Sequence, residues 1–577
     1  MKKTLLLLVC FWFSSVLLFA QSINWQWVQR STSHGNGSDG EGWGVTTDRN
    51  NNVFVTGAFI DTVFFAPDTL LNTLRDGNLK FYIVKYDSAG NVLWAKKASG
   101  PDAQWGFSLA TDTGGSVYVT GPFWGDSITF DNITVLRQGT LSYPYNENIF
   151  IAKYDGAGNV LWAKGIYGNG DQSSNGIATD LSGNVYVTGN FLPDSISVGS
   201  MTLHNATDTG YTDAFVLKYD ALGNVVWVKD IGGDDNDAGT AVATDNNGNL
   251  FVCGFFNSDS IKLDAITLHN TQTNIDTNNP YHQEMFIVKY DAAGQLLWAQ
   301  NTIGIAEGAN IATDETGNLY TTEMFYGDSI NFGNTILHNT AGSGSIVSLI
   351  AKFDSLGTVQ WVKKIQAPGF VYAYNVAASA NGNVFVNGQF RGATVTCDST
   401  VLVLPAGSYD PMFIFTLNTQ GDVVCDAALT SGGEFRDGIC ADRSGNAIII
   451  ADFEVDPFVI GPDTLHIIGG TENVFVARLK CDTSQVENVN DLAKGSWLQI
   501  YPNPFSAQAT AKYSLPASAK NAALIVYDLL GRESASYKLP DAVGQVSINA
   551  NNISPGIYFY SLVADGNILA VRKMVIE

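Results

Sequence analysis

A phrase that returns along most of the chain constrains the fold more than any other feature of the sequence. Residues 150–164 read FIAKYDGAGNVLWAK, and close or worn copies occupy residues 81–96, 215–229, 286–300, 350–363 and 413–427. A second phrase, GIATDLSGNVYVTGNF at residues 176–191, starts again near Gly42, Gly106, Gly239, Gly308, Tyr374 and Asp437. Both phrases return every 63–71 residues. Such a period is the signature of repeat architectures, so the chain is expected to build its core by repetition.

Each phrase reads as two β-strands joined by a tight D-x-x-G-N turn. An Asp side chain at the start of such a turn accepts hydrogen bonds from backbone N–H groups two residues on, and the Gly supplies a positive φ. The recurring acids Asp180, Asp245, Asp314 and Asp442 resemble a row of calcium ligands. We interpret them as turn residues, because the D-x-D-x-D-G spacing of calcium loops is absent.

Four strands joined by short turns and repeated in this way predict a β-propeller. The last repeat ends at residues 474–480 with no fourth strand after it, whereas residues 23–29 (INWQWVQ) match the fourth-strand phrase. The N-terminal segment is therefore expected to supply the missing strand, which leaves no open edge. The prediction for residues 21–482 is an all-β, seven-bladed β-propeller closed by an N-terminal strand.

The two phrases carry a resemblance to a known family. In the forms D-x-x-G-N-[VL]-[YF]-V-T-G and F-[IV]-x-K-Y-D-x-x-G-N-[VL]-x-W they resemble the bacterial SBBP β-propeller repeat, from residue 23 to about residue 482. The match weakens in the sixth and seventh units, where Ser379 and Asn418 replace Asp and residues 448–450 read III. The resemblance implies a propeller and carries no common catalytic residue.

The chain changes character after the repeats. Residues 483–497 read as a linker, and the short strands of residues 498–577 predict a small Ig-like β-sandwich. The motifs YPNP at 501–504, VYD at 526–528 with Gly531, GIY at 556–558 and KMV at 573–575 resemble the C-terminal sorting domain of Bacteroidetes type IX secretion cargo. The resemblance implies type IX secretion machinery as a partner, and a protein that crosses the periplasm and is then secreted or held at the outer-membrane cell surface. An ordinary binding sandwich is the alternative.

The first 20 residues predict a signal peptide. Lys2 and Lys3 precede a short apolar run, and Ala20 is a plausible cleavage point. A membrane anchor is the weaker alternative because the run is short, and no later stretch predicts a transmembrane segment. Without these residues the formal charge is 29 − 55 = −26. Nucleic acid is not expected as a partner, because its binding depends on neutralising phosphates.

Cysteine and histidine spacing predicts no metal site. The five cysteines of the mature chain, Cys253, Cys397, Cys425, Cys440 and Cys481, are odd in number and irregularly spaced, so their disulfide pairing stays open. We interpret them as small buried hydrophobic residues, because Cys425 stands where other repeats have Trp. An insert within each repeat predicts an extra hairpin that places His204, His269, His338 and His466 at equivalent positions. Equivalent positions on separate blades lie too far apart to share one zinc ion.

The loops opposite the D-x-x-G-N turns vary between repeats and form the predicted binding face. Their aromatic rings could stack on sugars and their carboxylates could accept sugar hydroxyls; the candidate residues are Trp43, Trp105, Tyr167, Asp234, Asp235, Asp237 and Tyr372. The alternative is a solvated loop surface whose aromatics cover the core edges. Calcium is the one cofactor considered, through oxygen ligands of residues 234–237.

Motifs for catalysis are missing from the sequence. The chain has no G-x-S-x-G elbow, H-E-x-x-H pair or P-loop, and no catalytic residue is proposed. The leading hypothesis is a secreted or surface-attached propeller that binds glycan or protein without catalysis. Two alternatives stay open: a polysaccharide hydrolase or lyase on the same scaffold, and an architectural surface protein.

Overall fold

The structure of the chain is a computed structural model. It describes residues 21–33, 40–74, 76–138, 147–168, 170–192, 195–205, 210–272, 282–333, 335–339, 345–398, 400–404, 411–429, 438–481, 497–501, 505–515, 519–527, 532–550, 553–564 and 567–576. The predicted signal peptide and the linker up to residue 496 lie outside these ranges. The chain divides into two compact units between Cys481 and Asp482. Its described secondary structure consists of strands, and none of the described residues forms a helix that could cross a membrane.

The first unit is a series of antiparallel sheets of four strands, seven among the described residues. We number them in chain order: sheet 1 (β3 Gly40–Thr47, β4 Val53–Phe59, β7 Lys80–Tyr86, β8 Val92–Lys97), sheet 2 (β9 Ser108–Thr111, β10 Val117–Phe123, β13 Asn148–Tyr154, β14 Val160–Gly168), sheet 3 (β15 Gln172–Thr179, β16 Val185–Phe191, β19 Asp213–Tyr219, β20 Val225–Ile231), sheet 4 (β21 Asp237–Thr244, β22 Leu250–Phe256, β25 Glu284–Tyr290, β26 Leu296–Asn301), sheet 5 (β27 Ala306–Thr313, β28 Leu319–Phe325, β31 Val347–Phe353, β32 Val359–Gln366), sheet 6 (β33 Val371–Ala378, β34 Val384–Phe390, β37 Met412–Leu417, β38 Val423–Leu429) and sheet 7 (β39 Gly438–Ala441, β40 Ala447–Phe453, β43 Asn473–Cys481, β1 Gln21–Arg30).

A small hairpin lies between the second and third strands of each sheet, as the inserts predict. The hairpins are β5 (Thr62–Phe65) with β6 (Asp68–Leu71), β11 (Ser127–Phe130) with β12 (Ile133–Leu136), β17 (Ser195–Val198) with β18 (Met201–His204), β23 (Ser260–Leu263) with β24 (Ile266–His269), β29 (Ser329–Phe332) with β30 (Thr335–His338), β35 (Thr394–Cys397) with β36 (Thr400–Val403) and β41 (Phe458–Ile460) with β42 (Asp463–Leu465). They extend toward the preceding sheet: β17 pairs with β14, and β35 pairs with β32. The short strand β2 (Thr32–Ser33), which follows β1, pairs with β5 in the same way.

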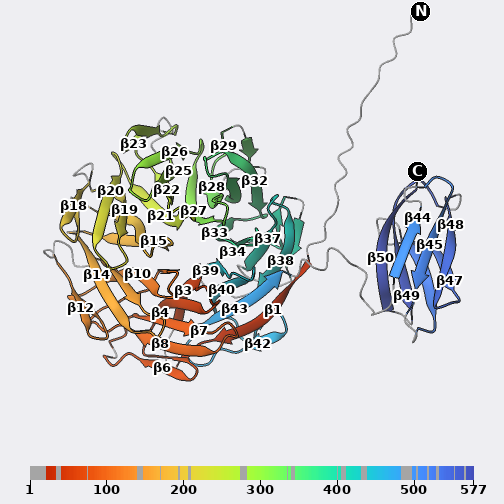
Figure 1. The fold of residues 1–577 in the computed structure, drawn as a ribbon, viewed down its shortest axis with the longest axis horizontal. Coiled ribbons are helices and arrows are strands. Elements are labelled where there is room, and N and C mark those ends of the chain that lie inside the picture. Colours follow the sequence, from red (N-terminus) through yellow and green to blue (C-terminus); the bar gives the residue numbers. More distant parts are fainter. Residues whose placement is uncertain are drawn as a thin grey trace, which may run out of the picture. The chain divides into compact units, whose positions relative to one another are not determined.

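The sheets follow one another around a common centre (Figure 1). Their first strands contact in the order β3, β9, β15, β21, β27, β33 and β39, and β39 also contacts β3. The N-terminal strand β1 lies against β43, with registers from Ile23↔Cys481 to Arg30↔Phe475. Residues 23–29 thus occupy the fourth position of the last sheet, where the sequence predicted them.

The D-x-x-G-N motif folds as the turn chemistry predicts. Asp180 Oδ1 accepts hydrogen bonds from the backbone N–H groups of Ser182 (2.9 Å) and Asn184 (3.0 Å), and its Oδ2 accepts one from Asn184 Nδ2 (2.6 Å). Gly183 has a φ of +78°, which a residue with a Cβ rarely adopts. These carboxylates therefore hold the turns of the sheets.

The repeated Lys and Trp of the first phrase bind neighbouring sheets together. Lys85 Nζ and Trp94 Nε1 of sheet 1 both donate to the Gly156 carbonyl in the second turn of sheet 2, at 2.9 and 3.2 Å. The same double contact joins later sheets through the carbonyls of Ala221, Ser355 and Thr419. Arg478 and Trp27 of sheet 7 donate to the Ser88 carbonyl of sheet 1, so the contact continues across the two ends of the unit.

Sheet 6 departs from this pattern, with Thr416 and Cys425 in place of the Lys and Trp. Its neighbour, sheet 7, has no turn between its third and fourth strands, because these strands are β43 and the N-terminal β1, and so it offers no such carbonyl. A disulfide between Cys425 and Cys481 joins the two sheets instead. The sequence left the pairing of the five cysteines open; Cys425 and Cys481 are bonded and not simply buried hydrophobic residues, whereas Cys253 and Cys397 are buried free thiols and Cys440 is a half-buried one.

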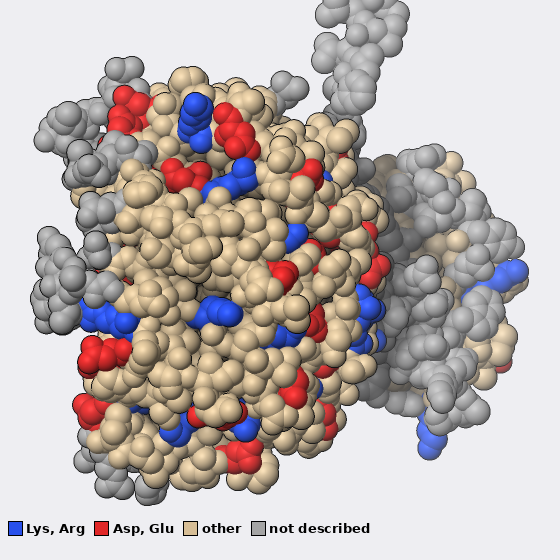
Figure 2. All heavy atoms as spheres, turned by 60° about the vertical axis from the view of Figure 1, so that its left-hand side comes forward, with Lys and Arg blue, Asp and Glu red and all other residues tan. Residues whose placement is uncertain are grey.

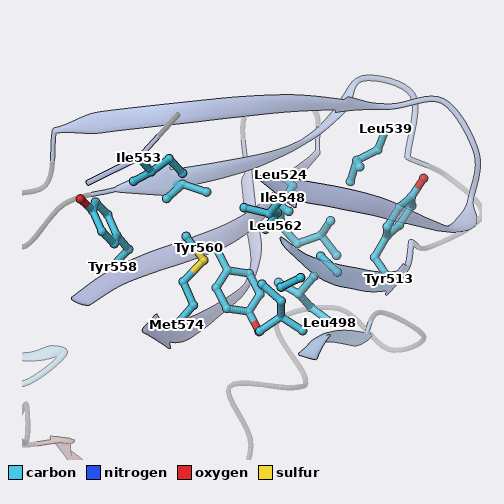
Figure 3. Close-up of a cluster of buried hydrophobic side chains, with 14 of the residues drawn as sticks. Leu498, Tyr513, Leu524, Leu539, Ile548, Ile553, Tyr558, Tyr560, Leu562 and Met574 are labelled. Atoms are coloured by element: carbon cyan, nitrogen blue, oxygen red, sulfur yellow. The ribbon is translucent and has the colours of Figure 1, made fainter. Parts of the chain in front are cut away.

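The second unit pairs two antiparallel sheets. One has the order β44 (Trp497–Tyr501), β45 (Gln508–Ser514), β48 (Val543–Asn549), and the other has the order β47 (Glu533–Leu539), β46 (Ala522–Tyr527), β49 (Gly556–Ala564), β50 (Asn567–Ile576). Their buried side chains form one core, drawn in Figure 3, to which the first sheet contributes Leu498, Tyr513 and Ile548 and the second contributes Leu524, Leu562 and Met574. This is the sandwich that the sequence predicted. Motif residues 502–504 and 528–531 lie outside the described ranges.

Candidate functional site

The antiparallel order of the strands gives each sheet of the first unit two unlike edges. The turns after the first and third strands lie at one edge, here called the turn edge. The hairpins and the connections between sheets lie at the opposite edge, here called the variable edge. Trp43, Trp105 and Tyr372 lie at the variable edge, close to the first strands that meet at the centre of the unit.

An aromatic cluster of Trp43, Trp105, Phe107 and Trp124 spans sheets 1 and 2 at the variable edge. The Trp43 ring stacks on Phe107 at a centroid distance of 4.2 Å and an interplanar angle of 8°. Trp105 lies 5.6 Å from Trp43 and 5.9 Å from Phe107, and Trp124 meets Trp105 edge-on at 4.5 Å. All four side chains are half-buried. The structure thus brings two predicted residues together and adds two that sequence reasoning missed.

Local backbone features place these rings. A β-bulge between Gly42 and Gly44 takes Trp43 out of the regular ladder. Gly106 lies so close to sheet 1 that an added Cβ would fall 1.9 Å from Thr56 Oγ1, so only glycine lets Phe107 come beside Trp43. Phe107 follows Gly106 as Trp43 follows Gly42, and this shared place in the repeat is the signal that could have identified it.

Polar groups accompany the aromatic cluster. Trp43 Nε1 donates to Glu41 Oε2 at 3.1 Å, which holds a carboxylate beside the rings. Trp105 Nε1 is buried and has no hydrogen-bond acceptor among the described residues. A stacked, partly exposed aromatic surface with a carboxylate beside it can bind a ligand that has both an apolar face and hydroxyl groups.

Tyr372 belongs to a second aromatic group at the start of β33. Its ring centroid lies 4.9 Å from that of Phe370 and 5.7 Å from that of Tyr374. The Arg391 guanidinium lies over the Phe370 ring at 4.8 Å.

The acidic residues of the predicted calcium loop, residues 234–237, each bind a different partner. Asp234 accepts a hydrogen bond from the Asp259 backbone N–H (2.9 Å), and Asp235 faces His282 Nε2 (3.4 Å). Asp237 is buried and accepts a hydrogen bond from Ser258 Oγ (2.7 Å). Across the described ranges, no three His, Cys, Asp or Glu side chains are arranged to hold a metal ion. Calcium at residues 234–237 stays a prediction.

Tyr167 lies away from both aromatic groups, at the outer rim. It lines a cavity of about 620 Å³ between the fourth strand of sheet 2 and the outer part of sheet 3. A smaller cavity of about 220 Å³ occupies the equivalent place between sheets 4 and 5. Sequence reasoning missed these rim cavities, because they depend on how one sheet's hairpin meets the next sheet's fourth strand.

The turn edge also encloses a cavity, of about 270 Å³, although its turns were interpreted as purely structural. It is lined by the first turns of sheets 3 to 7, including Thr179, Asp245, Asp314 and Arg443. Threonine hydroxyls link the first strands here, since Thr244 Oγ1 donates to the Thr179 carbonyl at 2.8 Å. Because the acids hold their own turns, this cavity has few groups left to bind a ligand.

The equivalent histidines do not converge. His204, His269 and His338 are exposed at the ends of separate hairpins. His466 Nδ1 lies 2.6 Å from Asp456 Oδ1 within its own hairpin region. Each histidine thus stays with its own sheet.

Several carboxyl groups have raised pKa values because they are buried. Burial raises the pKa of Glu147, Asp230, Asp237 and Glu323 to about 8. Burial also raises the pKa of Glu307, whose carboxylate accepts a hydrogen bond from Tyr326 Oη at 3.4 Å. Perturbed carboxyls are candidates for acid–base chemistry. Glu307 lies on the first strand of sheet 5, at the position that Glu41 holds in sheet 1.

Glu323 is expected to make stability fall as pH rises. It is fully buried, and its Oε2 has no hydrogen-bond partner among the described residues. Its folded-state pKa of about 8 lies above the ordinary 4.5, so between these values the folded chain holds a proton that the unfolded chain releases. The stability that this bound proton adds to the folded state is fully present below the ordinary pKa. It is lost as pH rises to about 8, at up to ~1.4 kcal/mol per pH unit.

Replacement of this acid tests the expectation. Glu323→Gln should flatten the plot of unfolding free energy against pH and should stabilise the protein at pH 8, as measured by denaturant unfolding. Glu315→Gln changes an exposed acid and serves as the control. An unchanged slope in Glu323→Gln would mean that Glu323 is already ionised in the folded protein.

Comparisons with known proteins match different parts of the chain. An uncharacterised WD repeat-containing protein of Acanthamoeba polyphaga mimivirus is 24% identical over 509 residues, which is 73% of this chain and 36% of that protein. The regulatory protein FlaEY of Caulobacter vibrioides is 32% identical over 112 residues, which is 19% of this chain and 12% of that protein. The chain thus spans about a third and about an eighth of the lengths of these curated relatives.

One solved structure, a protein of unknown function from Dyadobacter fermentans, is 9% identical, covers 80% of this chain and 99% of its own, and has a TM-score of 0.36. A similarity this low assigns neither a fold nor an activity. The C-terminal unit gives a specific result, because residues 499–577 match the family model "Secretion system C-terminal sorting domain". The unit that begins with β44 is therefore a type IX sorting domain, and the chain carries the signal for export and for secretion or cell-surface display.

Proposed function

We propose that residues 21–481 form a seven-bladed β-propeller of the SBBP type that acts outside the cell as a non-catalytic module binding glycan or protein. The sheets supply the blades, β1 supplies the closing strand, and the contact of β39 with β3 supports a closed ring. The sorting domain supports a site of action beyond the outer membrane. Residues 483–496 would then serve as the linker between the two parts.

The observation that carries the binding role is the half-buried stack of Trp43, Phe107 and Trp105. Large apolar side chains are normally covered, and an aromatic surface left partly open marks an interaction site. The flat faces suit the apolar face of a sugar ring, while the Glu41 carboxylate beside the rings offers an acceptor to its hydroxyls. Glycan is therefore the favoured ligand of this cluster, and a protein surface is the alternative.

A polysaccharide hydrolase or lyase is the second candidate, and one observation favours it. Burial raises the pKa of Glu307 above the ordinary value of a Glu carboxyl, which is the direction that a general acid requires. Glycoside hydrolysis, however, needs a second carboxyl at a set separation, so this candidate also requires an acid paired with Glu307. Product release from a polysaccharide panel, abolished in Glu307→Gln, would establish this candidate in place of the first.

Substitution of the stacked tryptophans tests the binding role. The double variant Trp43→Ala, Trp105→Ala should bind a polysaccharide selected from a panel about tenfold or more weakly than the wild type, since each lost stacking contact is worth ~1 kcal/mol. Isothermal titration calorimetry measures the affinity, and a thermal melt confirms that both proteins are folded. Tyr211→Ala removes an exposed aromatic outside the cluster and should bind as the wild type does.

Two results would count against the proposed site. Equal affinity of the double variant and the wild type would remove the cluster from the binding surface. Failure of the wild type to bind any polysaccharide, with or without EDTA, would leave protein ligands as the remaining class for this surface.

A further inference from the structure

The hairpins extend toward the fourth strand of the preceding sheet, and in sheets 2 to 7 one residue of the hairpin turn has a positive φ. It is Asp in sheets 2, 4 and 6 and Gly in sheets 3, 5 and 7: Asp131, Asp264, Asp398, Gly199, Gly333 and Gly461, with φ between 48° and 61°. Asp and Gly both tolerate this conformation better than other residues do. The backbone is thus the same in both cases, and the difference lies in whether a carboxylate is present.

In sheets 4 and 6 the Asp carboxylate fastens the hairpin to the preceding sheet, whereas Asp131 of sheet 2 has no such ion pair among the described residues. Lys229 Nζ lies 3.1 Å from Asp264 Oδ2, and Lys363 Nζ lies 2.7 Å from Asp398 Oδ2. Each lysine comes two residues after the repeated Trp of its fourth strand. These ion pairs close the gap between hairpin and strand at the sheet 3–4 and sheet 5–6 boundaries.

Where the turn residue is Gly199 or Gly333, a rim cavity remains. Gly199 lines the cavity of about 620 Å³ between sheets 2 and 3, and Gly333 lines the cavity of about 220 Å³ between sheets 4 and 5. The lysine position is occupied by Lys164 in the first cavity and by Gln300 in the second. Lys164 therefore corresponds to Lys229 and Lys363 but faces a turn without a carboxylate, and no ion pair to it exists among the described residues.

The larger cavity also carries an aromatic surface. The Tyr167 ring folds over Gly165, where an added Cβ would come within 2.2 Å of the ring, and Tyr167 and Tyr219 both line the cavity. Gln138 and Ser200 add uncharged polar groups. The cavity therefore combines an unpaired cation, a ring face and hydrogen-bonding groups.

We propose that this rim cavity binds an acidic saccharide, with a carboxylate on Lys164 and a further sugar ring against Tyr167, which lies on the opposite face of β14. The bound carboxylate would take the place that Asp264 and Asp398 occupy at the closed boundaries. This site is separate from the Trp43 cluster and does not depend on it.

The negative charge of the whole chain does not exclude such a ligand. Figure 2 shows the outer rim, where acidic and basic side chains are interspersed among uncharged ones rather than gathered into one acidic patch. At physiological salt, charges more than ~8 Å away are largely screened, so a half-buried lysine inside the cavity outweighs distant carboxylates.

A single substitution should fill the larger rim cavity with a carboxylate of the protein itself. Gly199→Asp should place a carboxylate on Lys164, as at the closed boundaries, after a small shift away from Val225 Cγ2, which would lie 3.0 Å from the new Cβ. We expect Gly199→Asp and Lys164→Gln each to weaken binding of an oligogalacturonate at least tenfold in calorimetric titration. Gly333→Asp makes the same change in the cavity that has Gln300, its Cβ meets no atom within 4 Å, and it should bind as the wild type does.

The ligand provides a second control. The methyl ester of the same oligogalacturonate keeps the sugar rings and removes the charge, so it should bind at least tenfold more weakly, and added salt should weaken binding of the acid form only. The Trp43→Ala, Trp105→Ala variant should still bind the oligogalacturonate at the rim cavity. The rim site and the central cluster can therefore be tested independently. The proposal is overturned if the wild type does not bind the acid, if acid and ester bind equally, or if neither Gly199→Asp nor Lys164→Gln weakens binding.

Discussion

Removal of residues 497–577 is expected to leave the rest of the chain in the periplasm of a bacterium that has a type IX secretion system. The removed segment is the sorting domain. The remaining part keeps β1, β43 and all the sheets of the first unit, because these pairings lie before Asp482. The truncated protein should therefore stay folded, as circular dichroism of the periplasmic fraction would show, while immunoblots of the medium and the cell surface lose the signal. Its appearance at the surface would contradict the role of this domain.

Two point variants test whether export requires the sorting domain to be folded or only to be present in the chain. Leu562 is fully buried between the two sheets of the sandwich, so Leu562→Asp places a charge in its core at a cost of several kcal/mol. Val543 is 65% exposed in the same unit, and Val543→Asp adds the same charge at little cost. We expect the first variant to be retained and the second to be exported; export of both would mean that the machinery reads an unfolded segment.

The turns and strands of the first unit could be predicted from the sequence, because the residues of each turn satisfy one another's hydrogen bonds. The Asp180 turn needs only residues 180–184 to satisfy its hydrogen bonds. The fourth-strand phrase at residues 23–29 likewise identified its own position beside β43. In both cases a repeated local pattern determines the structure, so one sequence was sufficient.

The candidate site was less predictable, because it depends on contacts between sheets. Trp43 and Trp105 were selected as variable aromatics, but Phe107 joins them only because Gly106 lets two sheets approach closely. Tyr167 was assigned to the same face and instead lies in a rim cavity that the Gly199 turn leaves open. The spacing of residues along the chain does not predict which side chains of neighbouring repeats contact one another.

The cysteines show how a correct observation led to a wrong conclusion. Cys425 does stand where other repeats have Trp, a position that on its own suggests simple hydrophobic packing. The Trp of other repeats donates to a carbonyl in the second turn of the next sheet, as Trp94 does to Gly156. Beyond sheet 6 that turn is missing, and Cys481 lies beside the start of β1 instead.

Loss of the Cys425–Cys481 disulfide is expected to weaken the boundary at which the two ends of the first unit meet. The bond closes a loop of 56 residues and joins sheets 6 and 7, where Thr416 and Cys425 replace the paired Lys and Trp donors. The double variant Cys425→Ser, Cys481→Ser should lose about 2–4 kcal/mol of unfolding free energy, measured by denaturant titration. Reductant should lower the midpoint of the wild type and of Cys397→Ser, which keeps the bond, but not that of the double variant. If the double variant unfolds at the same denaturant concentration as the wild type, β1 and the contacts of Arg478 and Trp27 with the Ser88 carbonyl suffice to hold the two ends together.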